Sequence, residues 1–267
     1  MTGGLDYRCA VVTGASSGLG AEFARQLAPR CRTLVLIARR EARLNELALK
    51  LREDHPQLQV EVFAIDLTDP AARQGLISAL AAAGQFPDLL VNNAGMGDYG
   101  EVAAADWSKT EAMLRLNIEA LTAMTQAVVP AMVAAGNGAV LNVSSLACML
   151  PIPDFAVYAA SKAYVTSFSE ALRLELREHG VRVTALCPGP VHTEFGAIAR
   201  RETRGGESPF REAFYVEARQ VVSEALEGLM EDRARVFPGW KIAAAALLLG
   251  VIPMGALRLM MSTRPRR

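Results

Sequence analysis

The sequence predicts a single α/β domain, covering residues 1–267, in which a doubly wound parallel sheet of about seven strands is flanked by helices. Two observations predict this fold. Apolar runs of strand length alternate with longer helical patterns along most of the chain, with no linker-like stretch between them. The chain has 267 residues and is 51% hydrophobic, so it can bury one large core.

Six apolar runs have the length and composition of buried strands. They lie at 9–13, 33–38, 60–65, 89–92, 139–143 and 181–186. The segments between them have helical patterns, which predict helices from the first glycine-rich turn to about 28, from 41, and near 69–83, 106–135 and 156–179. Because each strand is followed by a helix, neighbouring strands are expected to run parallel.

Two segments depart from this alternation. Residues 190–215 carry Pro, Gly and charged residues without clear periodicity, and we expect a mobile or functional loop, such as a lid over an active site. Residues 240–262 predict an apolar C-terminal helix, although Pro253 interrupts the pattern. Only 16 residues, 242–257, lack an ionisable group, which is short for a membrane span. A buried or subunit-facing helix is favoured, with a peripheral membrane contact or a true anchor as alternatives.

Charge and cysteine content exclude several classes of protein. Lys+Arg and Asp+Glu both number 28, and this neutral balance argues against a nucleic-acid partner. The four cysteines are scattered and form no CxxC pair, so we expect no disulfide framework and no metal site. Residues 1–8 are polar and do not resemble a signal peptide. These features favour a cytoplasmic protein, with membrane association as an alternative.

A glycine-rich turn follows the first strand and opens a helix. It has the sequence Thr13-Gly-Ala-Ser-Ser-Gly-Leu-Gly20, in which Gly14, Gly18 and Gly20 allow the backbone to approach a pyrophosphate. The helix N-terminus would then supply unpaired N–H groups and a positive dipole end. A purely structural turn is the alternative, since such a motif alone is weak evidence.

The end of the second strand indicates which dinucleotide is bound. An acidic residue there usually holds the ribose 2′-hydroxyl of NAD, but this strand ends in Ala38-Arg39-Arg40. A guanidinium can instead pair with a 2′-phosphate, so NADP is preferred and NAD is less favoured. Arg39 is the first choice for this contact and Arg40 a partner, unless both are solvated residues at a helix start.

Tyr158 and Lys162 are four residues apart in a predicted helix and therefore share one face. A tyrosine normally keeps its proton to about pH 10, and a nearby ammonium is expected to lower that pKa. Ser144 and Ser145 end the preceding strand, where ligands of α/β sheets bind, and a serine hydroxyl there could polarise a carbonyl oxygen. A helix-surface pair is the alternative for Tyr158 and Lys162 taken alone.

In combination, these motifs resemble the short-chain dehydrogenase/reductase family. Thr13-Gly-x-x-x-Gly-x-Gly20, Asn92-Asn-Ala-Gly95, Asn117, Ser145, Tyr158-x-x-x-Lys162 and Pro188-Gly-Pro-Val191 with Thr193 occur in the family's order. The resemblance implies a Rossmann-type fold, with Tyr158 as general acid/base and Lys162 as its activator and ribose anchor. It further implies that Ser145 steadies the substrate oxygen and that Asn117 holds a water in a proton relay.

The resemblance and the turn together predict the cofactor contacts. The expected cofactor-binding residues are Gly14, Ser16, Ser17, Gly18, Leu19, Gly20, Arg39, Arg40, Asp66, Leu67, Asn93, Ala94, Gly95, Tyr158, Lys162, Pro188, Gly189, Val191 and Thr193. Within this set, Asp66 resembles the residue that contacts adenine. Val191 and Thr193 resemble the pair that contacts the nicotinamide carboxamide.

We therefore expect an NADP-dependent oxidoreductase that moves a hydride between the nicotinamide and a carbonyl or secondary alcohol. The apolar C-terminal segment points to a hydrophobic small-molecule substrate. Members of the family usually form dimers or tetramers through the helices near 106–135 and 156–179, so a homodimer or homotetramer is expected. A non-catalytic NADP-sensing module is the alternative, which the set Ser145, Tyr158 and Lys162 disfavours.

Overall fold

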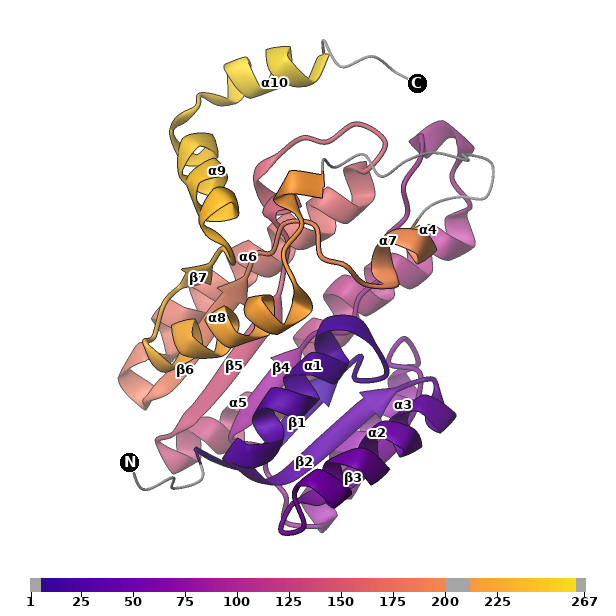
Figure 1. The fold of residues 1–267 in the computed structure, drawn as a ribbon, viewed down its shortest axis with the longest axis vertical. Coiled ribbons are helices and arrows are strands. Elements are labelled where there is room, and N and C mark those ends of the chain that lie inside the picture. The colour runs from indigo at the N-terminus through magenta and orange to yellow at the C-terminus, as the bar shows by residue number, and fades with distance from the viewer. Residues whose placement is uncertain (1–5, 200–211, 263–267) are drawn as a thin grey trace.

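The computed structural model describes residues 6–199 and 212–262 and contains one parallel sheet of seven strands (Figure 1). The strand order is β3-β2-β1-β4-β5-β6-β7. The strands are β1 Tyr7–Thr13, β2 Cys31–Ala38, β3 Gln59–Ala64, β4 Leu89–Asn92, β5 Gly138–Val143, β6 Val181–Leu186 and β7 Arg235–Val236. The predicted doubly wound fold is confirmed, and its strand order reverses between β1 and β4, where ligands bind in such sheets.

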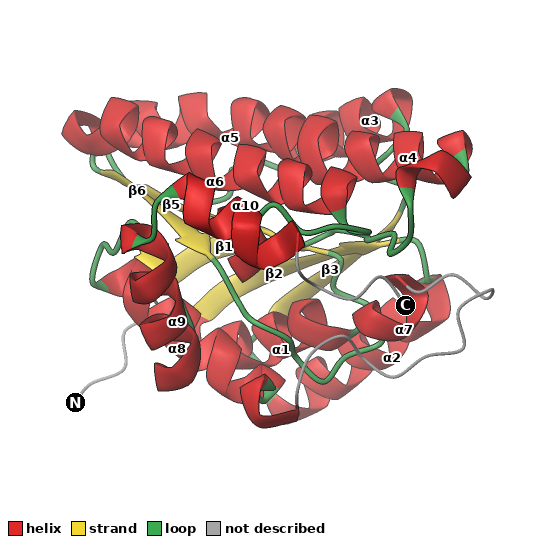
Figure 2. Cartoon of the chain, turned by 90° about the horizontal axis from the view of Figure 1, so that it is seen from above, coloured by secondary structure: helices red, strands yellow, loops and turns green. Residues whose placement is uncertain are grey.

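Helices cover both faces of the sheet (Figure 2). One face carries α1 (Gly18–Leu27), α2 (Glu41–Asp54) and α8 (Ala218–Met230). The other carries α3 (Pro70–Ala82), α5 (Leu121–Ala135) and α6 (Ala156–Leu176). Side chains of β1 alternate between the two layers, since Ala10 and Val12 pack on the first face and Cys9 and Val11 on the second. All four are buried, which explains the uninterrupted apolar run.

The segment predicted as one helix over 106–135 is helical throughout but not uniform. It comprises α4 (Trp107–Leu114), a π-helical turn at Arg115–Ala120, and α5. Of the described residues, this stretch is the one whose length and apolar composition would allow a membrane crossing. It contributes Met113, Met124, Val128 and Met132 to the cores, so it serves here as a packed helix.

The C-terminal segment is two helices rather than the single helix predicted over 240–262. They are α9 (Trp240–Val251) and α10 (Met254–Ser262), which lie beyond one end of the sheet (Figure 1). Pro253 separates them because it lacks the N–H that a continuous helix requires. Ile242 and Ala246 of α9 are buried, whereas Leu247, Leu248 and Val251 are exposed, so the helix is only partly buried. Contact with another subunit stays a prediction, and the membrane contact given as an alternative is not supported.

Parts of the predicted lid at 190–215 are described. Residues 190–199 include the short helix α7 (Phe195–Ala199), and 212–215 include a 3₁₀ turn at Glu212–Phe214. Val191 forms a parallel bridge with Val216, which ties the two described parts together. The remainder, 200–211, lies outside the described residues.

Candidate active site

The glycine turn lies against the end of β4. Thr13 Oγ1 accepts hydrogen bonds from the backbone N–H groups of Asn93 (3.0 Å) and Ala94 (2.9 Å). Asn93 Nδ2 donates to Thr13 O at 2.9 Å. A Cβ on Gly20 would lie 2.1 Å from Gly14 O, so only glycine fits there. The turn is thereby held tightly, with the N-terminus of α1 facing the carboxyl edge of the sheet.

The N-terminus of α1 keeps donors for a ligand. Ser17 is its N-cap residue but makes no side-chain capping bond, so the first backbone N–H groups are not satisfied by the cap. Gly14 and Gly18 have φ angles of 67° and 54°, which other residues rarely adopt. A phosphate group is the type of ligand that this geometry accepts.

Arg39 and Arg40 point to different neighbours. Arg40 donates to Ser16 Oγ at 3.2 Å and to Ser17 Oγ at 2.5 Å, so its guanidinium lies against the glycine turn. Arg39 lies 3.8 Å from the Asp66 carboxylate, with its side chain 72% exposed. Arg40, the partner residue in the sequence prediction, therefore lies at the glycine turn and Arg39, the first choice, does not, and the contact of either with a 2′-phosphate stays a prediction.

Tyr158 lies at the start of α6 and is only 6% exposed. Its ring stacks on Phe155, with centroids 4.2 Å apart, and Phe195 of α7 covers it at 5.5 Å. Burial raises the pKa of Tyr158 to about 12, and a hydrogen bond with the Ser145 side chain opposes that rise. The lowered pKa expected from Lys162 is therefore absent, because removal from water outweighs the other effects.

Lys162 is buried one turn further along α6. Its Nζ donates to Val143 O at 2.8 Å and lies 5.7 Å from the centroid of the Tyr158 ring. Burial lowers the pKa of Lys162 to about 8. A Cβ on Gly95 would lie 3.4 Å from this Nζ, so the backbone after β4 passes close to the amine.

Asn117 occupies the π-helical turn and is 1% exposed. Its Nδ2 donates to Met96 O (2.9 Å) and Ser161 Oγ (3.0 Å), while its Oδ1 accepts from Met96 N (3.0 Å). Ser161 in turn donates to Tyr158 O at 2.7 Å. The turn thus directs Asn117 toward the helix that carries Tyr158 and Lys162, a common use of π-helical turns at functional sites.

The two serines that follow β5 have different surroundings. Ser144 is buried, donates to Lys162 O at 2.8 Å and lies 2.7 Å from Thr166 Oγ1. Ser145 accepts from Ala147 N at 3.1 Å and is hydrogen-bonded to Tyr158. Ser144 therefore fastens α6 to β5, while Ser145 is the serine beside the phenol, as the resemblance implied.

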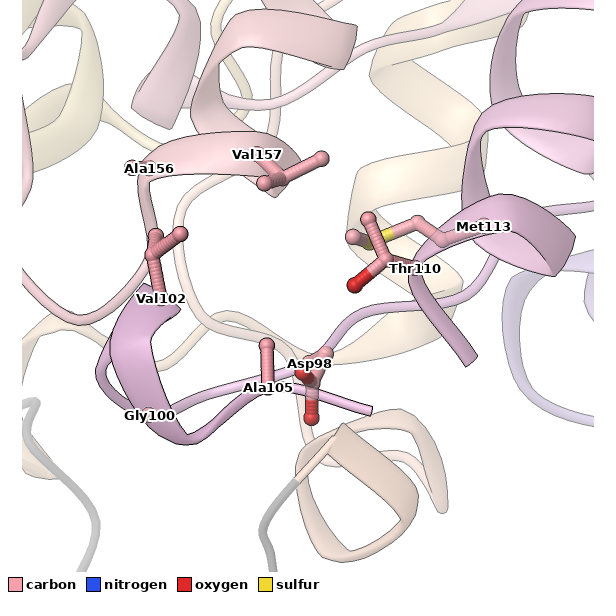
Figure 3. A pocket seen from close by; sticks show the side chains of 8 residues that line it. All are labelled: Asp98, Gly100, Val102, Ala105, Thr110, Met113, Ala156 and Val157. Atoms are coloured by element: carbon pink, nitrogen blue, oxygen red, sulfur yellow. The ribbon is translucent and has the colours of Figure 1, made fainter. Parts of the chain in front are cut away.

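A small cavity of about 10 Å³ is lined by the eight residues shown in Figure 3, of which Ala156 and Val157 directly precede Tyr158 in the chain. It is formed by the loop after β4, by α4 and by the first turn of α6. Its lining includes the apolar side chains of Val102, Ala105, Met113 and Val157 and the hydroxyl-bearing Thr110. Asp98 is also part of the lining, and its carboxylate is paired with Lys109 at 3.0 Å.

Comparison with known proteins identifies the family. The family model described as short chain dehydrogenase matches residues 8–204. The chain belongs to the short-chain dehydrogenase family. It is 36% identical over 225 residues to sulfoacetaldehyde reductase 2 of Chromohalobacter salexigens, which covers 82% of this chain and 85% of that protein. It is 34% identical over 204 residues to the Homo sapiens very-long-chain 3-oxoacyl-CoA reductase, covering 75% and 64% of the two chains.

A solved structure gives the same result. The short-chain dehydrogenase from Sphingobium yanoikuyae in complex with NADPH has a TM-score of 0.82 and 32% identity, covering 97% of this chain and 96% of that one. The family resemblance inferred from the motifs is thus confirmed, and this short-chain dehydrogenase is an oxidoreductase.

Several neighbours of the site in this short-chain dehydrogenase were not predicted. Ser161 supports Asn117, and the rings of Phe155 and Phe195 enclose Tyr158. Glu194 and Arg43 join Arg40 at the glycine turn. The charged segment Arg40-Glu-Ala-Arg43 could have suggested Arg43, which lies near Arg40 in the first turn of a predicted helix. Phe155 is likewise only three residues before Tyr158, whereas the contacts of Ser161, Phe195 and Glu194 join distant parts of the chain and leave no local pattern.

Proposed function

We propose that this short-chain dehydrogenase is an NADP(H)-dependent oxidoreductase that transfers a hydride between the nicotinamide and a carbonyl or secondary alcohol carbon, with Tyr158 as general acid/base. The observation that carries the proposal is the grouping of Tyr158, Ser145 and Lys162 beyond the carboxyl end of β5. This group lies on the same edge of the sheet as the glycine turn after β1.

The residues at the glycine turn fit a dinucleotide. Because Gly20 has no side chain, the start of α1 can lie close to the backbone of Gly14. The uncapped start of α1 offers N–H groups to a pyrophosphate. No carboxylate follows β2 directly, and the guanidinium of Arg40 lies beside two serine hydroxyls. This set suits a 2′-phosphate better than a 2′-hydroxyl, which supports NADP over NAD. The Sphingobium yanoikuyae relative carries NADPH in its solved structure.

When a carbonyl is reduced, side chains of the chain supply the proton that its oxygen receives. When bound, the reduced nicotinamide supplies the hydride. Even a solvated tyrosine keeps its proton at neutral pH, and burial raises the pKa of Tyr158 further, so its phenol can transfer a proton to the oxygen of the substrate. Ser145 donates a hydrogen bond to the same oxygen, and the Lys162 ammonium stabilises the phenolate that forms. Asn117 and Lys162 hold the water that restores the proton.

The apolar helix α9 supports a hydrophobic substrate, because it packs against the turn Leu146–Met149 that directly follows Ser145. The relatives named above are described as reductases of sulfoacetaldehyde and of 3-oxoacyl-CoA, which are both carbonyl compounds. A homodimer or homotetramer and a cytoplasmic location stay predictions.

A panel of aliphatic, aromatic and acyl ketones and aldehydes tests the proposal. We expect consumption of NADPH, measured by its absorbance, with at least one apolar carbonyl compound and slower consumption of NADH. Binding of NADPH without turnover on any member of the panel would instead favour the non-catalytic NADP-sensing module. Equal rates with NADH would contradict the cofactor preference while leaving the reaction type intact.

A further inference from the structure

A carboxylate of the chain itself occupies the group of cationic and hydroxyl side chains at the glycine turn. Glu194 Oε2 accepts from Arg40 Nη1 at 2.8 Å, and its Oε1 accepts from Arg43 Nη1 at 2.6 Å. The same Arg40 guanidinium donates to Ser16 and Ser17. We call Arg40, Arg43, Ser16 and Ser17 the basic cluster. The two arginines hold the pKa of Glu194 down at about 2, so its charge persists at every working pH.

The basic cluster has the composition and position of a 2′-phosphate site. Two guanidinium groups and two hydroxyls can supply several charge-assisted hydrogen bonds to one tetrahedral anion. The cluster lies where β2 ends beside the glycine turn, which is where the adenosine ribose of a dinucleotide binds in this fold. The side chains of Arg40, Arg43 and Glu194 are 41%, 47% and 44% exposed, so an anion from solution can reach them.

Glu194 also connects the cluster to Tyr158. It directly precedes Phe195, the first residue of α7, whose ring covers the Tyr158 ring. Phe195 also lies close to Gly97, since a Cβ there would be 2.9 Å from its Cζ. At the other end of α7, Ala199 O accepts a hydrogen bond from Tyr99 N at 2.8 Å. A side chain that is held by the basic cluster is thus adjacent to the ring that closes the site.

We propose that Glu194 is an internal competitor for the 2′-phosphate of the cofactor, and that its displacement releases α7 from its place over Tyr158. The inference rests on the proposed use of NADP. NADPH carries the anion that displaces Glu194, whereas NADH lacks it and leaves α7 docked. Glu194 and Arg43 are therefore specificity-determining residues, because they make access to Tyr158 depend on the 2′-phosphate.

Two nucleotides that lack the nicotinamide test the competition. Adenosine 2′,5′-bisphosphate carries the 2′-phosphate and adenosine 5′-monophosphate does not, and the affinity of each is measured by calorimetry. We expect Glu194→Gln to tighten binding of the bisphosphate roughly three- to tenfold, as for the loss of two exposed ion pairs, with the monophosphate unchanged. The matched control is Glu231→Gln, which removes an exposed glutamate paired with Arg233 just before β7. This control should change neither affinity.

Hydrogen exchange tests the movement of α7 and separates it from simple charge repulsion. The Tyr99 amide is the reporter, because its hydrogen bond to Ala199 exists only while α7 is docked. The bisphosphate should speed exchange at Tyr99 in the natural protein, and the monophosphate should not. Glu194→Gln should show fast exchange without any nucleotide.

Each outcome has a separate meaning. No binding of the bisphosphate to the natural protein would overturn the proposed NADP function itself. Binding that Glu194→Gln leaves unchanged or weakens would overturn only the competition. Suppose that Glu194→Gln binds the bisphosphate more tightly but exchange at the Tyr99 amide is unchanged. Glu194 would then only repel the phosphate, and the proposed release of α7 would be overturned.

Discussion

The site has two parts that are stabilised by opposite means. Around Tyr158, Lys162 and Asn117, the side chains are buried, and their orientation is fixed by hydrogen bonds within the chain. Around Arg40 and Glu194, the side chains are more than two-fifths exposed and are joined by ion pairs. Buried hydrogen bonds are costly to leave unmade, whereas exposed ion pairs contribute little and exchange readily with other ions.

This difference suits the two parts to different tasks. The buried part can hold the proton donor at a constant position and with an altered pKa, because water does not compete there. The exposed part can exchange one anion for another, because neither its cations nor its carboxylate loses much contact with water. Changes to the buried part are therefore expected to affect the rate of the chemical step. Changes to the exposed part should affect binding.

Removal of the phenol hydroxyl should have the largest effect. Tyr158→Phe retains the ring that stacks on Phe155 but cannot transfer a proton, so we expect a loss of turnover of about 10²- to 10⁴-fold. Affinity for adenosine 2′,5′-bisphosphate, measured by calorimetry, should stay within about twofold because the exposed part is intact. Turnover close to that of the natural protein would refute the role of Tyr158.

Charge reversal at the exposed part should alter cofactor choice. Arg40→Asp removes the guanidinium beside Ser16 and Ser17 and places a carboxylate near the 2′-position, so we expect the ratio of kcat/KM for NADPH over NADH to fall roughly 10- to 100-fold. Arg39→Asp should lower the ratio less, because Arg39 points toward Asp66. Steady-state kinetics with both cofactors measures this. A larger effect at Arg39 would restore the contact first favoured from the sequence.

Much of this architecture is predictable because it depends on local patterns. Six strands appear as apolar runs, since both faces of a parallel sheet are covered. The strand β7 has only the two residues Arg235 and Val236 and no pattern of its own. It exists because β6 offers a free edge, with Ala185 opposite Arg235. A strand this short cannot be predicted from its own sequence, because its pairing depends on the edge of the sheet beside it.

In the site too, features set by local spacing were predictable and features set by distant contacts were not. The i,i+4 spacing places Tyr158 and Lys162 on one helix face, which is a local property. The contact between Arg40 and Glu194 joins residues 154 positions apart, and no sequence pattern predicts it. The raised pKa of Tyr158 was also missed, because the expectation weighed the charge of Lys162 but not the loss of water around the ring.

The pH dependence should distinguish the two parts. The pKa of Lys162 is lowered to about 8, so its amine is charged below pH 8 and neutral above it. We therefore expect kcat for carbonyl reduction to fall up to about tenfold per pH unit above 8, since the phenolate that forms loses its cation. A solvated lysine would stay charged to about pH 10.

Affinity for the bisphosphate should be constant from pH 7 to 9, since arginine does not titrate there. A flat kcat profile over the same range would show that the charge on Lys162 does not limit the reaction.

Salt should have the smallest effect, and only on binding. Raising ionic strength from about 0.1 M to 1 M shortens the Debye length from about 10 Å to 3 Å, which weakens attraction between the basic cluster and a 2′-phosphate. The same screening weakens the pairs that Glu194 makes with Arg40 and Arg43, so the two effects partly cancel. We expect the KM for NADPH to rise only about two- to threefold, with kcat unchanged because the groups around Tyr158 are buried. In Glu194→Gln the competitor is absent, and the rise in KM with salt should be steeper. An equal salt dependence in the two proteins would mean that Glu194 and the cofactor do not share the cluster.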